Sequence, residues 1–501
     1  MLVDATQHFN IHYCTAAGAL LHTMLLLIYW TRTITDAGSL DHGLHRLPIG
    51  GFQRTLALAI IAIPSFGFTR NMESLRIGPN HISIADPEAL EAVYGHSNGL
   101  LKSEFYETFN PGSERDVFNV RDRADHTLKR KRIANIFSLQ SILAFEPRVK
   151  EHLQQFCAQL DMRCERSLKN TSGFNWSAKG GRAVLNFPPQ LAYLTFDIIS
   201  DLALGVPFRM VERQKDSTPA SLACSGSRPY PPWIQKLLLF GTPFNIPALI
   251  TLRDFRNTTK AAVDARINRM KNDEQEDEER GADLMDRLFE IKNPDGSPLS
   301  REDIDAQAFL VFSAGSDTTA NSLSGLSYYI ASNPRARKKL QEELDSALSS
   351  SVEFDDDQVA HTVPSYEQIK NLPYLNACVK EGLRLYSTLG LGLPRVVPPG
   401  KTLTIAGDLQ RRKRHQRTLA YRPERWIEDT TGSLNKYFAA FSFGPRACLG
   451  RNLANLNLLL IAATFFHRYD VELASPSTKL SIKEGIVRES TRCELSLKRR
   501  V

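Results

Sequence analysis

One stretch near the C-terminus constrains the fold more than any other. Residues 441–450 read Phe-Ser-Phe-Gly-Pro-Arg-Ala-Cys-Leu-Gly, and an apolar, helix-like run follows over residues 452–466. A thiolate on Cys448 would be stabilised by the first free N–H groups of that helix and by its dipole, and such a thiolate is a good metal ligand. Gly450 leaves room for a flat, bulky group beside the backbone. The stretch therefore predicts a metal or cofactor site at the start of a helix.

Arg446, in the same stretch, offers a planar fork of donors for a carboxylate. Gly444 and Pro445 favour a turn between Phe441 and the cysteine. Taken alone, Cys448 is also explained as a small buried hydrophobe. The combination of turn, arginine, cysteine and glycine instead favours a site for a planar cofactor.

A long helix is predicted from Ser300, which forms a capping signal with Asp303, to about Ser332. Its centre, residues 314–319, reads Ala-Gly-Ser-Asp-Thr-Thr, and these residue types are poor choices for a helix interior. Small residues here would open a groove for a molecule such as dioxygen, while Asp317 and Thr318 would supply an acid and a hydroxyl for proton delivery. An accidental polar patch is the alternative.

Two pairs of residues share a helix face by their spacing. His126 and Arg130 lie four apart and together suit one anionic group, although a solvated basic face explains them as well. Glu381 and Arg384 lie three apart and suit a charge-assisted pair, for which an ordinary surface pair is the simpler interpretation. The intervening residues 140–270 predict mostly helices.

The bulk composition excludes several classes of protein. The 501 residues are ordinary in their mixture of apolar and charged types, so the chain is not disordered. The net charge of +7 mildly favours acidic partners or an anionic membrane surface, but no zinc-finger spacing or basic-aromatic pattern indicates nucleic acid. Seven scattered cysteines do not form a disulfide framework, which favours a reducing compartment.

The N-terminal part of the chain predicts a membrane anchor. A short tail, residues 1–13, precedes the apolar run of residues 14–30, which is near the lower limit for a membrane-spanning helix. A buried core helix is the alternative. The basic residues that follow would keep the body of the protein in the cytosol. Residues 31–75 are predicted to form a linker with an atypical apolar segment, and residues 76–501 the main domain.

These motifs, in this order, resemble those of the cytochrome P-450 family in its fungal, membrane-bound form. The resemblance covers about residues 74–400 and 421–500. It implies a mainly α fold with a smaller β-rich lobe, the cytochrome P-450 fold, behind an N-terminal membrane anchor. It also implies a haem b cofactor, O2 as co-substrate, and electrons from NADPH through a separate reductase. The implied reaction inserts one oxygen atom of O2 into a hydrophobic small molecule.

The resemblance assigns roles to particular residues. Cys448 would be the axial thiolate and the metal ligand, and Asp317 and Thr318 would be the catalytic proton relay. The residues that would contact the haem are Cys448, Arg446, Phe441, Gly450, His126, Arg130 and Arg395. A structural triad would consist of Glu381, Arg384 and Arg425. Pocket-lining residues would be Phe309, Phe312, Ala314, the loop 387–393 and residues 485–487.

Residues 116–123 and 196–203 resemble the benzoate 4-monooxygenase and pisatin demethylase-like branch. This implies an aromatic, terpenoid or polyketide substrate in fungal secondary metabolism, with a benzoate-type aromatic acid hydroxylase of catabolism as the alternative. The implied partners are NADPH-cytochrome P-450 reductase, the substrate and a membrane, with no nucleic acid. The implied location is the endoplasmic reticulum membrane, crossed once, with the catalytic domain facing the cytosol.

The chain departs from the family pattern between residues 401 and 420. The family has more sheet in this region, whereas this chain has a short segment with a basic run at residues 411–417. A solvated loop, a nuclear-targeting lookalike, a docking patch for an acidic reductase and a deletion all explain the run. Lost strands would leave backbone edges unpaired near the substrate channel. A haem-binding but catalytically impaired pseudoenzyme is therefore a further alternative.

Overall fold

The computed structural model of the protein describes residues 74–78, 81–84, 86–96, 98–109, 114–215, 246–272, 283–349, 363–390, 392–404 and 419–500. The predicted tail, the predicted anchor and nearly all of the predicted linker lie outside these ranges, as does the basic run at residues 411–417. Among the helices of the described ranges, none is both long enough and apolar enough to cross a membrane.

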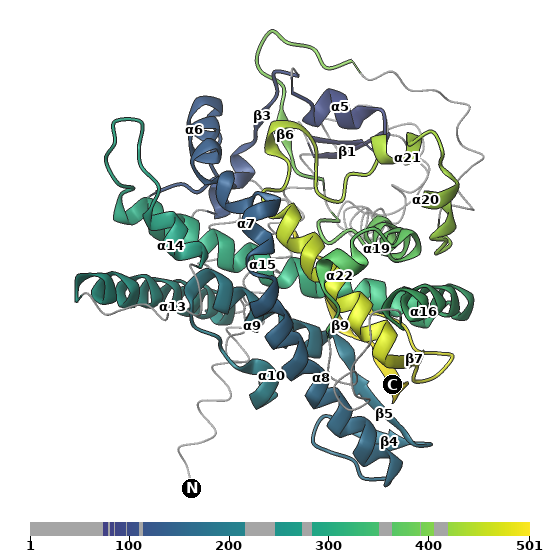
Figure 1. The fold of residues 1–501 in the computed structure, drawn as a ribbon. Coiled ribbons are helices and arrows are strands. Elements are labelled where there is room, and N and C mark those ends of the chain that lie inside the picture. The colour runs from purple at the N-terminus through teal and green to yellow at the C-terminus, as the bar shows by residue number, and fades with distance from the viewer. Residues whose placement is uncertain are drawn as a thin grey trace, which may run out of the picture.

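Long helices form most of the described molecule (Figure 1). They are α8 (Glu146–Leu168), α9 (Phe187–Leu204), α13 (Ile246–Lys271), α15 (Arg301–Ala331), α16 (Pro334–Ser349), α19 (Pro373–Leu385) and α22 (Arg451–Arg468). Shorter helices and 3-10 turns connect them: α5 (Ala89–Tyr94), η1 (Glu104–Phe109), α6 (Arg123–Ile133), η2 (Asn135–Phe137), α7 (Leu139–Leu143), α10 (Met210–Arg213), α14 (Leu284–Phe289), α18 (Tyr366–Ile369), α20 (Glu424–Glu428), α21 (Ser433–Lys436) and η6 (Gly444–Arg446).

The strands of the described chain form small antiparallel sheets. A four-stranded sheet has the order β4-β5-β10-β7, with β4 at Trp176–Lys179, β5 at Arg182–Asn186, β7 at Tyr469–Leu473 and β10 at Glu494–Arg499. The two-stranded ribbons are β1 (Ser74–Gly78) with β2 (His81–Ile84), β3 (Leu101–Lys102) with β6 (Arg395–Val396), and β8 (Ser481–Lys483) with β9 (Glu489–Arg492). The prediction of a mainly α fold with less sheet is therefore confirmed.

The prediction that residues 140–270 are mostly helical misses one hairpin. Strands β4 and β5 pair around the turn Gly180-Gly181, where both glycines have positive φ angles of 58° and 71°. Positive φ at two successive residues suits a tight hairpin turn and favours glycine. The hairpin gains its stability from distant residues, because Leu185 pairs with Leu495 at the other end of the chain. A local sequence window does not contain that partner.

Helix α15 matches its prediction at both ends. The Ser300 side chain accepts a hydrogen bond from Asp303 N at 3.1 Å, and the helix ends at Ala331 with Ser332 as its C-terminal cap. Its second half is almost entirely buried. Gly315 lies against α9, where a Cβ on this residue would be 2.7 Å from Ile199 Cδ1. The glycine therefore allows the two helices to approach closely.

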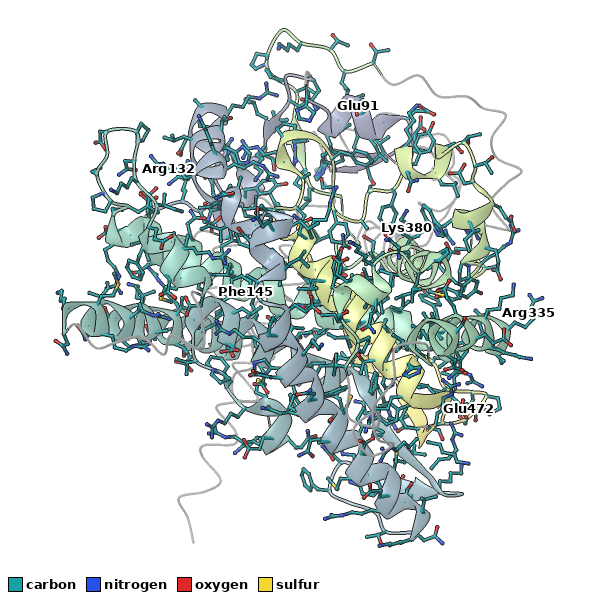
Figure 2. The ribbon with its side chains drawn as sticks, in the orientation of Figure 1. Glu91, Arg132, Phe145, Arg335, Lys380 and Glu472 are labelled. Atoms are coloured by element: carbon teal, nitrogen blue, oxygen red, sulfur yellow. The ribbon has the colours of Figure 1, made fainter. Side chains whose placement is uncertain are left out.

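Glycines also allow α15 to pack closely against α19. A Cβ on Gly325 of α15 would lie 2.5 Å from Tyr386 Cγ, and one on Gly382 of α19 would lie 2.8 Å from Leu326 Cδ1. Further along the core, Phe145 fills the junction of α7 and α8 and is 1% exposed (Figure 2). The Arg287 guanidinium covers the Phe145 ring, with its carbon 4.8 Å from the ring centroid. The site elements described below are mounted on this packed helical body.

Replacing Gly325 by alanine is expected to destabilise the protein. The added methyl would overlap the Tyr386 side chain, which is 1% exposed and has little room to move. Overpacking of this kind costs about 1–3 kcal/mol. Thermal melting of Gly325→Ala should show a lower Tm, while Gly392→Ala, whose added Cβ would meet only the Tyr94 hydroxyl at 3.7 Å, should melt like the unaltered protein. Equal melting of both variants would contradict this account of the α15–α19 packing.

Candidate active site

The loop that carries Cys448 is folded back on itself. The backbone N–H of Cys448 donates to the carbonyl of Phe441 at 2.8 Å. Gly444 has a φ of 63°, and a Cβ on it would lie 2.1 Å from the carbonyl oxygen of Tyr94 at the end of α5. Glycine is required there for both reasons. The turn expected from Gly444 and Pro445 therefore exists as η6, and it fixes the position of the cysteine.

Among the free cysteines of the described ranges, Cys448 is exposed. The others are buried: Cys157, Cys164, Cys378 and Cys493. The Cys448 thiol faces open space on one side, although protein atoms crowd it elsewhere. This desolvation raises the pKa of the thiol, and the Gly450 N–H and the nearby Arg451 and Arg130 guanidinium groups oppose the rise. A Cβ on Gly450 would have no atom within 4 Å, so there is room beside the backbone at the start of α22.

A group of cationic side chains, here called the basic cluster, lies next to this loop. Its members are Lys102 of β3, His126 and Arg130 of α6, Arg395 of β6 and Arg446 of η6. Each of the arginines is held by backbone or hydroxyl oxygens: Arg130 by the carbonyl of Ala447 at 2.8 Å, Arg446 by the carbonyl of Val120 at 2.8 Å, and Arg395 by the hydroxyl of Tyr106 at 2.7 Å. The arginines are thus aimed without being neutralised by these partners.

The charges of the basic cluster oppose one another. Burial and then the positive charge of Arg446 lower the pKa of Lys102 to about 6. Burial and the same arginine lower the pKa of His126 to about 3. Burial and Arg395 lower the pKa of Arg446 to about 10. Such repulsion is relieved when an anion binds between the groups. The cluster therefore suits a ligand with carboxylates.

Two acids lie close to the basic cluster and do not balance it. Asp116 is buried, and its side chain accepts hydrogen bonds from the backbone N–H groups of Phe118 and Asn119. Burial raises the pKa of Asp116 to about 6. Asp122 is used as the N-cap of α6, where it accepts from Asp125 N. The His126 imidazole is 4% exposed and forms no hydrogen bond with another residue of the described ranges, so it is available to a ligand.

Asp317 and Thr318 lie at the centre of α15 and have different surroundings. Thr318 is half-buried, and its hydroxyl donates to the carbonyl of Ala314 at 2.8 Å. Ala314 itself is exposed, although it lies in the middle of a helix whose neighbouring residues are largely buried. This side of α15 therefore faces open space, whereas Gly315 faces α9. Ala314 and Thr318, and not the glycine, lie where the sequence predicts a groove.

The Asp317 side chain is buried, and its carboxylate accepts no hydrogen bond from a residue in the described part of the chain. Burial, followed by the negative charge of Glu489, raises the pKa of Asp317 to about 7. A carboxyl group with such a pKa can hold or release a proton near neutral pH. That behaviour suits an acid for proton delivery.

One residue expected to line a pocket does not do so. Phe312 is 0% exposed and stacks on Phe255, with ring centroids 4.4 Å apart and planes 2° from parallel. Phe196 and Phe208 complete an aromatic core around it. The prediction is wrong because successive residues of one helix face different neighbours, and Phe312 faces the interior. Phe309, one turn away, is half-buried.

Glu381, Arg384 and Arg425 come together as the family resemblance implies, and not as the ordinary surface pair that the spacing alone suggests. The Glu381 carboxylate is 0% exposed and accepts hydrogen bonds from Arg384 Nε at 2.9 Å and Arg425 Nε at 3.0 Å. The indole of Trp426 and the backbone N–H of Arg422 donate to it as well, at 3.0 and 2.9 Å. Burial alone would raise the pKa of Glu381, but these donors, the Arg384 guanidinium first, lower it overall.

The cluster around Glu381 joins α19 to α20. On the outside of this joint, Lys380 Nζ lies 5.7 Å from the centroid of the Trp426 ring (Figure 2). Phe438 contacts the same indole edge to face, with centroids 5.3 Å apart. Because α20 precedes the Cys448 loop in the chain, the buried carboxylate helps to anchor the segment that leads to the cysteine.

Two residues of this region were missed by the sequence analysis. Lys102 belongs to the basic cluster, but it lies in a two-residue strand and has no partner at helical spacing. Glu489 acts on Asp317 from β9, which lies 172 positions further along the chain. Neither residue forms part of a recognisable motif, and only the tertiary structure brings each one to the site.

The mainly helical fold and a cysteine loop beside a group of basic side chains are features that known proteins share, and comparison with these proteins gives the family. The Cytochrome P450 family model matches residues 70–497. The chain is 33% identical over 463 residues to benzoate 4-monooxygenase bphA of Aspergillus niger, covering 85% of each chain. It is 28% identical to pisatin demethylase of Fusarium vanettenii over 439 residues, covering 80% of this chain and 78% of the relative.

A crystal structure of a cytochrome P450 has the same fold. It superposes with a TM-score of 0.67 at 18% identity, covering 88% of this chain and 99% of the other. The chain belongs to the cytochrome P450 family. It is therefore a haem-dependent monooxygenase that uses O2 and electrons from NADPH through a reductase, and the family's substrates are generally hydrophobic.

The residues of the site fit a haem group. Arg130, Arg395 and Arg446 of the basic cluster donate to carbonyl and hydroxyl oxygens in the described structure, which suits two propionates. Cys448 provides an exposed sulfur at the start of α22, and Gly450 leaves space beside it. These features arise from separate parts of the chain and converge on one location.

Replacing Asp317 by asparagine is expected to stabilise the protein in a pH-dependent way. Below the ordinary carboxyl pKa of 3.8, Asp317 holds its proton in both the folded and the unfolded chain, so its ionisation does not lower the free energy of unfolding. As the pH rises, the unfolded chain loses this proton first, and the cost to the folded state grows until the pH passes about 7. The full cost to the free energy of unfolding is on the order of 4 kcal/mol.

The measurement is the Tm of the haem-containing protein between pH 5 and pH 8.5. The gap between Asp317→Asn and the unaltered protein should widen with pH and become constant above about pH 7. Glu342→Gln, which removes an acid that is 60% exposed, serves as the control and should show no such gap. A gap for Asp317→Asn that does not depend on pH would contradict the raised pKa.

Proposed function

We propose that Cys448 is the axial thiolate of the haem iron and that the basic cluster holds the haem propionates. The observation that carries this proposal is the position of the exposed Cys448 next to three arginines whose guanidinium groups are held by carbonyl and hydroxyl oxygens. Arg130 connects the two features, because it donates to the carbonyl of Ala447 beside the cysteine. His126, Arg395, Arg446 and Lys102 are the other proposed propionate contacts.

Phe441 and Gly450 are proposed to border the haem from the cysteine side. The carbonyl of Phe441 holds the Cys448 N–H, and the Arg451 guanidinium lies 5.5 Å from the Phe441 ring centroid. The triad of Glu381, Arg384 and Arg425 is proposed to be structural. Its buried hydrogen bonds fix the segment before the loop and thereby the direction of the thiol.

When bound, the haem supplies the activation of O2, so that one oxygen atom enters the substrate and the other leaves as water. The protein's own part is the supply of protons. Asp317 is proposed to hold a proton on its carboxyl group, because its pKa is raised to about 7 by burial and by Glu489. Thr318 is proposed to orient water with its hydroxyl, which borders the open side of α15. Both residues thus act from the helix that faces the site.

The proposed substrate is a hydrophobic small molecule, and the proposed setting is fungal secondary metabolism. Ala314 offers an apolar surface on the open side of α15, whereas the half-buried Phe309 packs edge to face against Phe255. The second candidate is a benzoate-type aromatic acid, which is supported by the 33% identity to a benzoate 4-monooxygenase. Addition of benzoate, monitored by a shift of the haem Soret band, distinguishes the two candidates.

The proposed location is the endoplasmic reticulum membrane, crossed once by residues 14–30, with the domain in the cytosol. The proposed electron donor is NADPH-cytochrome P-450 reductase. A pseudoenzyme is a second candidate for the function, because β3 and β6 pair through only two residues each beside the shortened region. Sustained lack of NADPH consumption with a reductase, across a broad substrate panel, would favour the pseudoenzyme.

The carbon monoxide difference spectrum of the reduced protein tests the role of Cys448. The unaltered protein should show a strongly red-shifted Soret band, because a thiolate donates electron density to the iron. Cys448→Ala should lose this band. Cys493→Ala, which alters a free cysteine that is 1% exposed, should keep it. An unshifted band in the unaltered protein, or a shifted one in Cys448→Ala, would overturn the proposal.

Replacing Lys102 by methionine should weaken haem retention. One charge-assisted contact to a propionate is worth about 1.5 kcal/mol, so transfer of haem to apomyoglobin should be about tenfold faster. Lys102→Arg should retain haem better than Lys102→Met, because it keeps the charge. Lys338→Met, at a lysine that is 78% exposed, is the matched control. Equal transfer rates for Lys102→Met and the control would remove Lys102 from the proposed propionate contacts.

A further inference from the structure

Glu489 has a carboxylate oxygen that the fold leaves without a hydrogen bond. Its Oε2 atom is buried and accepts none in the described structure, although the side chain as a whole is 23% exposed. The nearest cation is Lys483, whose Nζ lies 3.5 Å from Oε2 and whose side chain is 47% exposed. A solvent-exposed pair of this kind contributes little to stability. A buried, unsatisfied carboxylate oxygen therefore needs another explanation.

Strand β9 is tied to α15 beside Asp317. The backbone N–H of Ser490 donates to Asn321 Oδ1 at 2.6 Å, and Asn321 lies one turn after Asp317 on the same face of the helix. Ser490 is itself fixed, because its hydroxyl is 2.7 Å from the hydroxyl of Tyr386. Glu489, next to Ser490, is thus held at a defined place relative to α15.

A second set of hydrogen bonds holds the start of β9 to the same part of α15. The backbone N–H of Arg488 donates to the carbonyl of Thr388 at 2.7 Å. The Thr388 hydroxyl in turn lies 2.7 Å from the hydroxyl of Ser322. The β8–β9 hairpin is therefore fastened to the helix on both sides of Glu489.

Asp317 and Glu489 interact through their charges. Burial raises the pKa of Asp317, and the negative charge of Glu489 raises it further. Glu489 is the charged group of the described chain that acts on Asp317, and on the side of α9 the neighbouring Gly315 meets the apolar Ile199. Glu489 in turn faces Lys483. The order from the interior to the solvent is therefore Asp317, Glu489 and Lys483.

We propose that Glu489 is a proton relay that connects Asp317 to solvent at the β8–β9 hairpin. This inference rests on the proposed role of Asp317 as a proton donor. Glu489 passes the proton to Asp317 and does not itself contact the reacting atoms. Lys483, whose side chain is 47% exposed, marks the solvent end of the route.

The proposed relay moves one proton in two steps. An O–H bond of a solvent hydronium ion at the hairpin breaks and leaves water, as an O–H bond forms on the Glu489 carboxylate. That bond breaks as an O–H bond forms on the ionised Asp317 carboxylate, either directly or across one water. Glu489 is then a carboxylate again, and Asp317 is ready to donate. One proton enters for each cycle, and no electrons move.

The test is an infrared measurement on the haem-bound ferric protein, without turnover. The carbonyl stretch of protonated Asp317 is identified as the band that Asp317→Asn lacks. Its titration midpoint reports the interaction between the two carboxyl groups. The rate at which the band shifts after rapid mixing with D2O reports how fast Asp317 exchanges its proton with solvent.

Glu489→Gln should slow this exchange by about tenfold or more, because the route to solvent is cut. It should also move the titration midpoint of Asp317 to lower pH, because a negative charge is removed. Glu484→Gln, which removes an acid of the same hairpin that is 58% exposed and pairs with Arg488, should change neither value. Glu489→Asp should give an exchange rate between those of Glu489→Gln and the unaltered protein.

An exchange rate in Glu489→Gln equal to that of the unaltered protein would overturn the relay. A midpoint that does not move would overturn it as well, because the two carboxyl groups would then not interact. If Glu489→Gln does not bind haem, Glu489→Asp carries the test, and an unaltered exchange rate in that variant counts against the relay. Normal turnover in Asp317→Asn would instead remove the proposed function of Asp317, and this outcome is independent of the exchange rate in Glu489→Gln.

Discussion

The Cys448 side of the site depends on the hydrogen bonds that the buried Glu381 carboxylate accepts. A fully buried carboxylate is costly unless its oxygens are satisfied, and here two guanidinium groups, an indole and a backbone N–H donate to it. Arg384 belongs to α19 itself, whereas the donors around α20 lie between 41 and 45 positions from Glu381 in the chain. Because all of these donors bind the one carboxylate of Glu381, the segment that leads to Cys448 is held in a single arrangement. The close contact of Gly444 with the Tyr94 carbonyl fixes the rest of the loop.

In contrast to the Glu381 carboxylate, whose charge is satisfied, the groups of the basic cluster repel one another. Its cations repel one another, and burial of Lys102 and His126 adds to the cost, so this region is less stable by itself than a neutral one would be. Proteins tolerate such local cost where a ligand relieves it. In a cytochrome P450 the haem carries two carboxylates, so cofactor binding and local stability are coupled in this proposed arrangement. The arginines keep their direction through carbonyl and hydroxyl acceptors that leave their charge free for the ligand.

On the α15 side of the site, the central group is the Asp317 carboxyl, whose burial disfavours its ionised form. Asp317 lies in the middle of α15, where the small residues allow close contact with α9 on one side and open space on the other. The adjacent hairpin brings Glu489 towards it and holds it there by hydrogen bonds from Ser490 and Arg488. The negative charge of Glu489 adds to burial in raising the pKa of Asp317. The proposed relay thus follows from the same packing that anchors β9 to the helix.

The sequence by itself determined the local features whose partners lie nearby. These are the cap and length of α15, the loop before α22, the pairing of Glu381 with Arg384, and, through resemblance to a family, the fold class. The tertiary structure decided the rest: the β4–β5 hairpin that depends on β10, the burial of Phe312 among aromatic rings, and the approach of Lys102 and Glu489 to the site. Motifs encode contacts within a few residues, whereas the energy of a buried charge depends on every group around it, and those groups are assembled only by the fold.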